Sequence, residues 1–108
     1  MSDFNKSSLS EIANLIKSKK VSSSEVTSHY IKNIEKGKKL NSFITTCFEE
    51  AVKKAKEFDN KKNFNSLLPG VPLAVKDLFC TKNVKTTAGS KILENFIPTY
   101  ESSVTHNL

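Results

Sequence analysis

The sequence contains no arginine: all 17 basic residues are lysines, set against 11 Asp and Glu, for a formal net charge of +6 at pH 7. Arginine supplies the bidentate and stacking contacts that phosphate and base recognition favour, so its absence weakens the nucleic-acid-binding interpretation that the charge suggests. The lysines are also interleaved with acids, 13 against 8 up to Lys62 and 4 against 3 beyond it. This pattern is typical of solvated helix faces.

Cysteine is scarce as well. Cys47 and Cys80 are isolated, without C-x-x-C spacing or a nearby pair of histidines, so a zinc site is not indicated and two reduced, buried thiols are expected. No window approaches the roughly 18 continuous apolar residues of a transmembrane helix, and the N-terminus lacks the apolar stretch of a signal peptide. The sequence therefore predicts a cytoplasmic protein without membrane association.

Common catalytic and nucleotide-binding motifs are also missing. None of G-x-x-x-x-G-K-[ST], G-x-G-x-x-G and G-x-S-x-G occurs, so phosphate binding and a hydrolase elbow both lack support. His29 and His106 have no Ser, Cys or carboxylate at a suitable spacing, and structural or surface roles are expected for them. The hydroxyls of Thr86, Thr87 and Ser90 are weak candidates, because nothing identifies a base for them.

The N-terminal part has the pattern of two helices. Two S-x-x-E capping boxes begin at Ser8 and Ser22, and each precedes apolar residues at helical spacing. The first helix is expected to end near Lys19 and the second at Gly37, a residue type that commonly follows a helix. Residues 1–39 are therefore predicted to form a leading helical hairpin.

Residues 40–108 are predicted to begin an α/β core. A strand is expected over 40–45, and a third capping box at Thr46 opens an amphipathic helix. An Asn- and Lys-rich loop follows over 59–66, and a short apolar strand over 71–75 is of the kind buried on both faces.

The C-terminal third is expected to be mostly loop, with a helical turn over 91–96 and a last helix capped by Ser102. Two strands make a poor sheet. The predicted fold class is α/β, a mixed β-sheet flanked by helices that is incomplete in this chain, which at 108 residues is one modest domain or part of a larger one. Further sequence or a partner is expected to complete the sheet, and unpaired strand edges favour self-association of the chain.

Lys76 stands out because it follows the apolar run 71–75, which begins after a Pro-Gly turn. In open α/β sheets, ligands and catalytic groups gather at the carboxyl ends of strands. A lysine in apolar surroundings has a lowered pKa and becomes a general base or an amine nucleophile. Two alternatives stay open on the pattern alone: Lys76 only marks the exit of the strand into solvent, and Asp77 either pairs with the ammonium or turns outward to cap the next turn.

Three motifs follow one another in the second half of the chain. They are G-[VI]-P-x-x-x-K-D at 70–77, T-T-x-x-S-K at 86–91 and P-x-Y-E-S-x-V at 98–104. In these motifs, and over nearly its whole length, the chain resembles the N-terminal part of the amidase signature family. The resemblance implies that Lys76 is the general base of a Ser-cisSer-Lys triad whose two serines lie downstream of Leu108.

Within this family the chain is most similar to the glutaminase subunits of tRNA-dependent amidotransferases. The resemblance implies that a serine activated through the lysine attacks glutamine and releases ammonia. In the heterotrimer of such enzymes, the B subunit would use the ammonia, with ATP and Mg²⁺, to amidate Glu- or Asp-tRNA, and the C subunit would hold the two together. The resemblance implies no cofactor, metal or substrate ligand on this chain. It also implies that Ser90 and Ser102 occupy motif positions with a structural role and are not the nucleophile.

From this resemblance we expect the 108 residues to be a truncated, inactive piece of one amidase-signature domain, with Lys76 more exposed than in a complete enzyme. Three alternatives stay open. The chain is part of an amidase-signature hydrolase of another amide, a stand-alone non-catalytic binding module, or a small basic nucleic-acid binder with a steep salt dependence.

Overall fold

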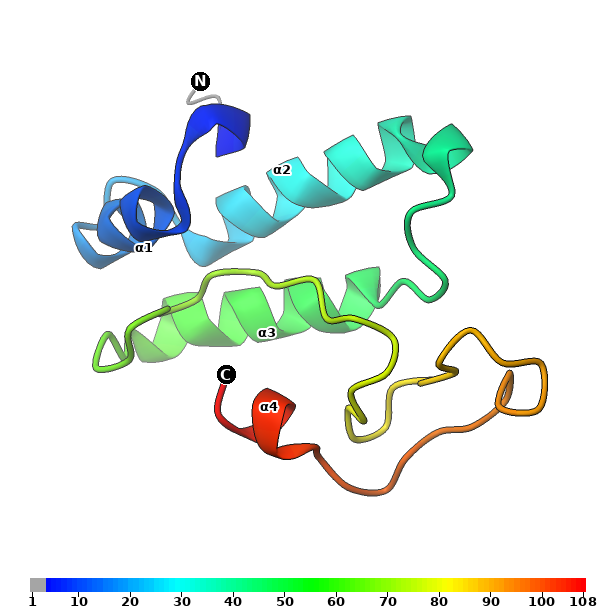
Figure 1. Ribbon diagram of the computed structural model, residues 1–108. Coiled ribbons are helices and arrows are strands. Elements are labelled where there is room, and N and C mark those ends of the chain that lie inside the picture. The colour runs from blue at the N-terminus through cyan, green and yellow to red at the C-terminus, as the bar shows by residue number, and fades with distance from the viewer. Residues whose placement is uncertain (1–3) are drawn as a thin grey trace. The chain divides into compact units, whose positions relative to one another are not determined.

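The computed structural model describes residues 4–108. Its elements are the short 3₁₀ helices η1 (Phe4–Lys6) and η2 (Lys38–Leu40) and the α-helices α1 (Leu9–Lys17), α2 (Ser23–Lys36), α3 (Phe48–Lys61) and α4 (Ser103–His106) (Figure 1). They belong to two compact units, the first made of residues 4–40 and 48–72 and the second of residues 41–47 and 73–108.

Both N-terminal capping boxes are confirmed. The Ser8 hydroxyl accepts from the Glu11 amide at 3.3 Å, and the Glu11 carboxylate accepts from the Ser8 amide at 2.6 Å. Ser22 and Glu25 form the same pair of bonds at 3.1 and 2.8 Å. Hydrogen bonds that each carboxylate accepts, first from the serine amide and then from the serine hydroxyl, hold the pKa of each glutamate below its ordinary value. Each of these two helices therefore begins with a capping box formed by residues only three positions apart.

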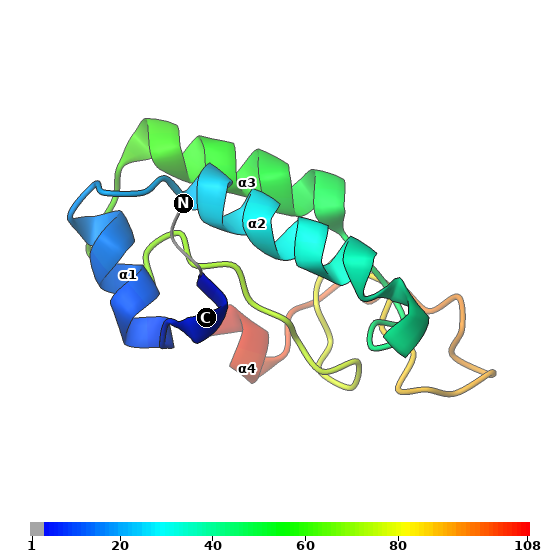
Figure 2. The same ribbon diagram turned by 90° about the horizontal axis from the view of Figure 1, so that it is seen from above.

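The first unit is a small helical layer. Figures 1 and 2 show α2 and α3 side by side and running in opposite directions, with α1 near the N-terminal end of α2. Val26 of α2 is fully buried, and burial of such a side chain contributes about 1.5–3 kcal/mol. The core consists of Phe4, Ile12, Ile16 and Val26, with Leu15, Val21, Tyr30, Phe58, Phe64 and Val71 packed against it.

The N-terminus of α2 is capped from α3. The Asp59 carboxylate accepts from the amides of Ser23 at 2.8 Å and Ser24 at 3.0 Å, which satisfies two free N–H groups and places a negative charge at the positive end of the helix dipole. The buried Ser23 hydroxyl donates to the carbonyl of Gly70 at 2.5 Å. The turn that opens the first sequence motif is thus tied to the helical layer.

Four expectations for this region differ from the structure. The loop expected from residue 59 begins after Lys61, because Asp59 is still helical and is bound to α2. The prediction of a third capping box is wrong: α3 begins at Phe48, so its N-cap position is residue 47, one residue after Thr46. Both cysteines are free, but Cys47 is exposed rather than buried. The helix expected to end near Lys19 already ends at Lys17.

The two expected strands are not found as strands. Residues 40–45 contain the end of η2 and irregular backbone, and 71–75 has no regular structure; no residue from 4 to 108 is assigned to a strand. A strand is defined by hydrogen bonds to a neighbouring strand, which an apolar run cannot supply for itself. The mixed α/β sheet stays a prediction, as does the division into 1–39 and 40–108. Within the described part of the chain, no helix is both long and apolar enough to cross a bilayer.

Candidate active-site segment

Lys76 lies in the second unit and its side chain is exposed. The apolar residues beside it, expected to be buried on both faces, are themselves open to solvent: Leu73 is 44% exposed and Val75 42%. That Lys76 is more exposed here than in a complete enzyme stays a prediction. Its assignment as a catalytic base remains a prediction.

The backbone turns sharply after Lys76. The Lys76 carbonyl accepts from the amides of Leu78 at 2.8 Å and Phe79 at 3.1 Å. The lysine is therefore the last residue of the irregular apolar run and the first of a tight turn. This turn sets the direction in which the chain leaves the lysine.

The Asp77 carboxylate binds the second motif. One carboxylate oxygen accepts from the Thr87 amide at 2.8 Å, and the other accepts from the Thr87 hydroxyl. The Asp77 carbonyl accepts from the Ala88 amide at 2.7 Å. Hydrogen bonds from the Thr87 hydroxyl and then the Thr87 amide hold the pKa of Asp77 below its ordinary value. Neither role considered for Asp77 from the sequence describes this arrangement, because its partner is a buried threonine ten residues away.

The third motif packs on the segment that follows Lys76. The carbonyl of the buried Pro98 accepts from the Asn83 amide at 2.9 Å, and the Cys80 carbonyl accepts from the Ser102 amide at 2.8 Å. Ser102 also caps α4 as predicted, through a bond of its hydroxyl to the Thr105 amide at 3.2 Å. The Cys80 thiol lies 3.5 Å from the Tyr100 hydroxyl and raises the pKa of that phenol. Hydrogen bonds thus join Asp77, the last residue of the first motif, to the second motif, and join Cys80 and Asn83, which follow the first motif, to the third.

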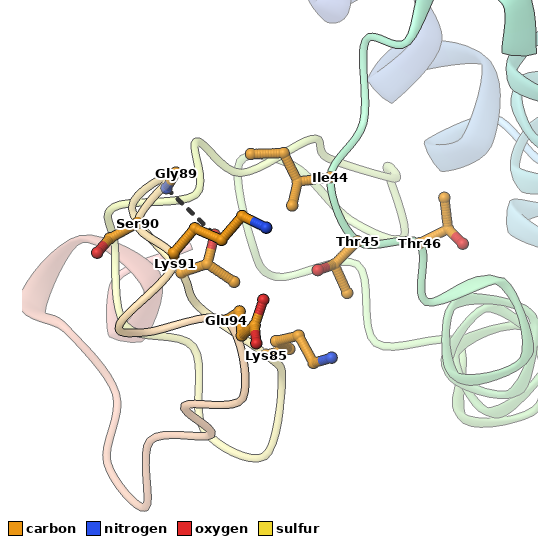
Figure 3. Close-up of a pocket in the computed structure, with 9 residues that line it drawn as sticks. Ile44, Thr45, Thr46, Lys85, Gly89, Ser90, Lys91 and Glu94 are labelled. Atoms are coloured by element: carbon orange, nitrogen blue, oxygen red, sulfur yellow. Dashed lines mark hydrogen bonds between the residues drawn. The ribbon is translucent and has the colours of Figure 1, made fainter.

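A shallow groove of about 520 Å³ lies on the second unit (Figure 3). Lys85, Lys91 and Glu94 are its charged residues, and Ser90 is partly buried in its wall. Its lining residues are Ile44, Thr45, Thr46, Lys85, Thr87, Gly89, Ser90, Lys91 and Glu94. Lys76 is not among them, so the groove and the candidate base are separate features.

The other sequence candidates have structural roles. The Thr86 hydroxyl donates to the Val84 carbonyl at 3.1 Å, and that of Thr87 is bound to Asp77. His29 packs edge-on against Phe4, with ring centroids 5.1 Å apart, and His106 is exposed in α4. Among residues 4–108, no three His, Cys, Asp or Glu side chains gather in a way that could hold a metal ion.

Comparisons with known proteins define the family. The sequence profile of the Amidase family matches residues 25–108, and the chain belongs to this family, as the three motifs predicted. Among curated relatives, the A subunit of the glutamyl-tRNA(Gln) amidotransferase of Pelagibacter ubique (strain HTCC1062) is 59% identical over 108 residues. The proteins of the same name from Rickettsia bellii (strain OSU 85-389) and Nitrosococcus oceani are 46% identical over 110 residues and 47% over 104.

These matches cover 100%, 100% and 94% of the chain, respectively, but only 22% of each relative. The chain thus spans about a fifth of the length of the curated relatives it matches. The similarity therefore identifies a segment shared with these subunits and does not extend to the rest of them.

Proposed function

We propose that this chain is the segment of a glutamine-hydrolysing amidotransferase A subunit that carries the general base, Lys76. The observation that supports this most strongly is the 59% identity over the whole chain to a protein of that name. The hydrogen bonds of Asp77 to the second motif, and those that join Cys80 and Asn83 to the third, are a second support, since they hold both later motifs against the segment that begins at the Lys-Asp pair.

In this proposal the unprotonated Lys76 amine accepts, through a bridging serine, the proton of a nucleophilic serine. The serine oxygen bonds to the side-chain carbonyl carbon of glutamine, the C–N bond breaks, and the proton passes to the departing nitrogen, so that ammonia leaves and water later releases glutamate. The two serines belong to the larger part of such subunits that the chain does not match. Neither their hydroxyls nor an apolar covering of Lys76 is supplied by residues 4–108, and we therefore expect the chain alone to be inactive.

The proposed product, ammonia, is consumed elsewhere. We propose that a partner B subunit, held by a C subunit, uses it in the cytoplasm to amidate a misacylated tRNA. The names of the relatives, which describe subunits of a tRNA amidotransferase, support this part of the proposal. The groove on the second unit has two lysines and one glutamate and is not assigned a part in it.

The test uses a full-length chimera in which residues 1–108 replace the matching segment of the Pelagibacter protein, assembled with the partner subunits of that enzyme. Ammonia release from glutamine is measured for the chimera and for the 108-residue chain. The chimera is expected to be active and the short chain inactive. Lys76→Ala should lower kcat of the chimera at least about 100-fold, because general-base catalysis contributes about 10²- to 10⁴-fold.

Lys82→Ala is the matched control, since Lys82 is another exposed lysine of the second unit, and it should leave kcat unchanged. Full activity of the Lys76→Ala chimera would contradict the proposal. So would Lys76-dependent ammonia release by the 108-residue chain alone.

A further inference from the structure

The hydrogen bonds of Asp77 restrain the backbone of its neighbour, Lys76. Both oxygens of the Asp77 carboxylate accept from Thr87, and its carbonyl accepts from Ala88 at 2.7 Å. The carbonyl of Lys76 itself accepts from the amides of Leu78 and Phe79 in the following turn. Every polar group of Asp77 that can accept a bond is therefore used to hold the chain directly after the lysine.

The partner of Asp77 is itself well fixed. Thr87 is only 5% exposed, and its hydroxyl oxygen accepts from the Gly89 amide at 3.1 Å while its proton goes to Asp77. The neighbouring Thr86 is 6% exposed and its amide donates to the Phe96 carbonyl at 3.0 Å. The carboxylate is thus held by a buried threonine whose own hydroxyl and neighbouring backbone are hydrogen-bonded.

From this geometry we propose that Asp77 and Thr87 are positioning residues for Lys76, which fix the direction in which the lysine side chain leaves the backbone. This inference rests on the proposed function. The amine of a general base must reach its serine within about 2.6–3.2 Å, and a misplacement of about 1 Å can cost about 100-fold in rate. Three acceptor atoms of the adjacent residue are anchored, and this restrains the backbone from which the lysine side chain leaves.

The test uses the same chimeric complex and three substitutions. Thr87→Val removes the hydroxyl at nearly constant volume, Thr87→Ser retains it, and Asp77→Asn keeps the shape but removes one acceptor oxygen and the charge. Thr87→Val and Asp77→Asn should each lower kcat for glutamine hydrolysis about 10- to 100-fold with KM changed less than about two-fold. Thr87→Ser should stay within about three-fold of the parent. The double variant should be no slower than the slower single variant, because the pair acts as a unit.

Rates are expressed per folded complex, with the folded fraction measured by circular dichroism, so that any unfolded protein is left out of kcat. A kcat within about three-fold of the parent for both Thr87→Val and Asp77→Asn overturns the inference. Equal losses in Thr87→Ser and Thr87→Val, or a rise in KM with kcat unchanged, overturn it as well. Lys76→Ala separates the two proposals: if it is inactive the proposed function stands whatever Asp77 does, and if it is active the proposed function itself fails.

Discussion

Among the three glycines of the chain, Gly70 has the least space for an added side chain. Its φ is +67°, and a Cβ placed on it would lie 2.6 and 2.7 Å from two ring carbons of Phe58 and 3.0 Å from the Cβ of Ser23. Gly70→Ala therefore meets two separate penalties. The left-handed conformation costs an alanine about 1–2 kcal/mol, and overpacking of this kind costs about 1–3 kcal/mol. The expected loss is about 2–5 kcal/mol of the free energy of unfolding.

Gly89 provides the matched control. It has the same φ of +67°, but a Cβ there would meet no atom within 4 Å. Gly89→Ala should therefore carry only the backbone penalty of about 1–2 kcal/mol, confined to the second unit. Urea unfolding followed by helical circular dichroism measures the first unit, and hydrogen exchange of the Ala88 amide measures the second.

The two penalties at Gly70 are contradicted if the free energy of unfolding of Gly70→Ala lies within about 0.5 kcal/mol of that of the parent, a difference that ordinary surface substitutions also give. The steric penalty is contradicted as well if Gly89→Ala lowers the stability of the helices as much as Gly70→Ala does. A Gly70→Ala loss that exceeds the loss at Gly89 by about 1–3 kcal/mol measures the steric overlap with Phe58.

Two further predictions concern the helix N-termini. Asp59→Ala should destabilise α2 by about 1–2 kcal/mol, the usual loss for a capping group, and the urea midpoint would detect it; an unchanged midpoint would show that water replaces the carboxylate. The pKa values of Glu11 and Glu25 are lower in the folded state than the unfolded-state value near 4.5. Their capping boxes therefore stabilise α1 and α2 fully above about pH 4.5, and this contribution is lost as the pH falls through the folded-state pKa values. Helical circular dichroism should therefore decline on acidification below about pH 4.5, and less so in the Glu11→Gln and Glu25→Gln double variant; equal pH dependence would contradict this account.

The sequence predicts the local features of this fold better than the distant ones. The boxes at Ser8 and Ser22 and the cap at Ser102 were predictable because donor and acceptor are three residues apart. The same pattern at Thr46 failed, since a capping box indicates that a helix starts nearby but does not fix its first residue. Residues 71–75 show the second limit: an apolar run becomes a strand only if a neighbouring strand is present.

The candidate site divides in the same way. The order of the three motifs was enough to predict the family, which the profile match confirms, and to select Lys76 as the residue to test. The bonds of Asp77 to Thr87 and of Asp59 to α2 were not predictable, because their partners are ten and thirty-six residues away and residue spacing carries no information on side-chain direction. For the bond of Asp77 to Thr87, the only indication in the sequence was a carboxylate directly after a candidate base.

The exposed apolar side chains near Lys76 also affect how the protein can be studied. Leu73, Val75 and Leu78 are 42–49% exposed in the folded chain, so a natively folded sample presents apolar surface to any dye that binds it. Fluorescence of such dyes is commonly taken as a sign of loosened packing. In this protein the folded state should already give a signal, and circular dichroism of α1–α3 is the observable that reports folding.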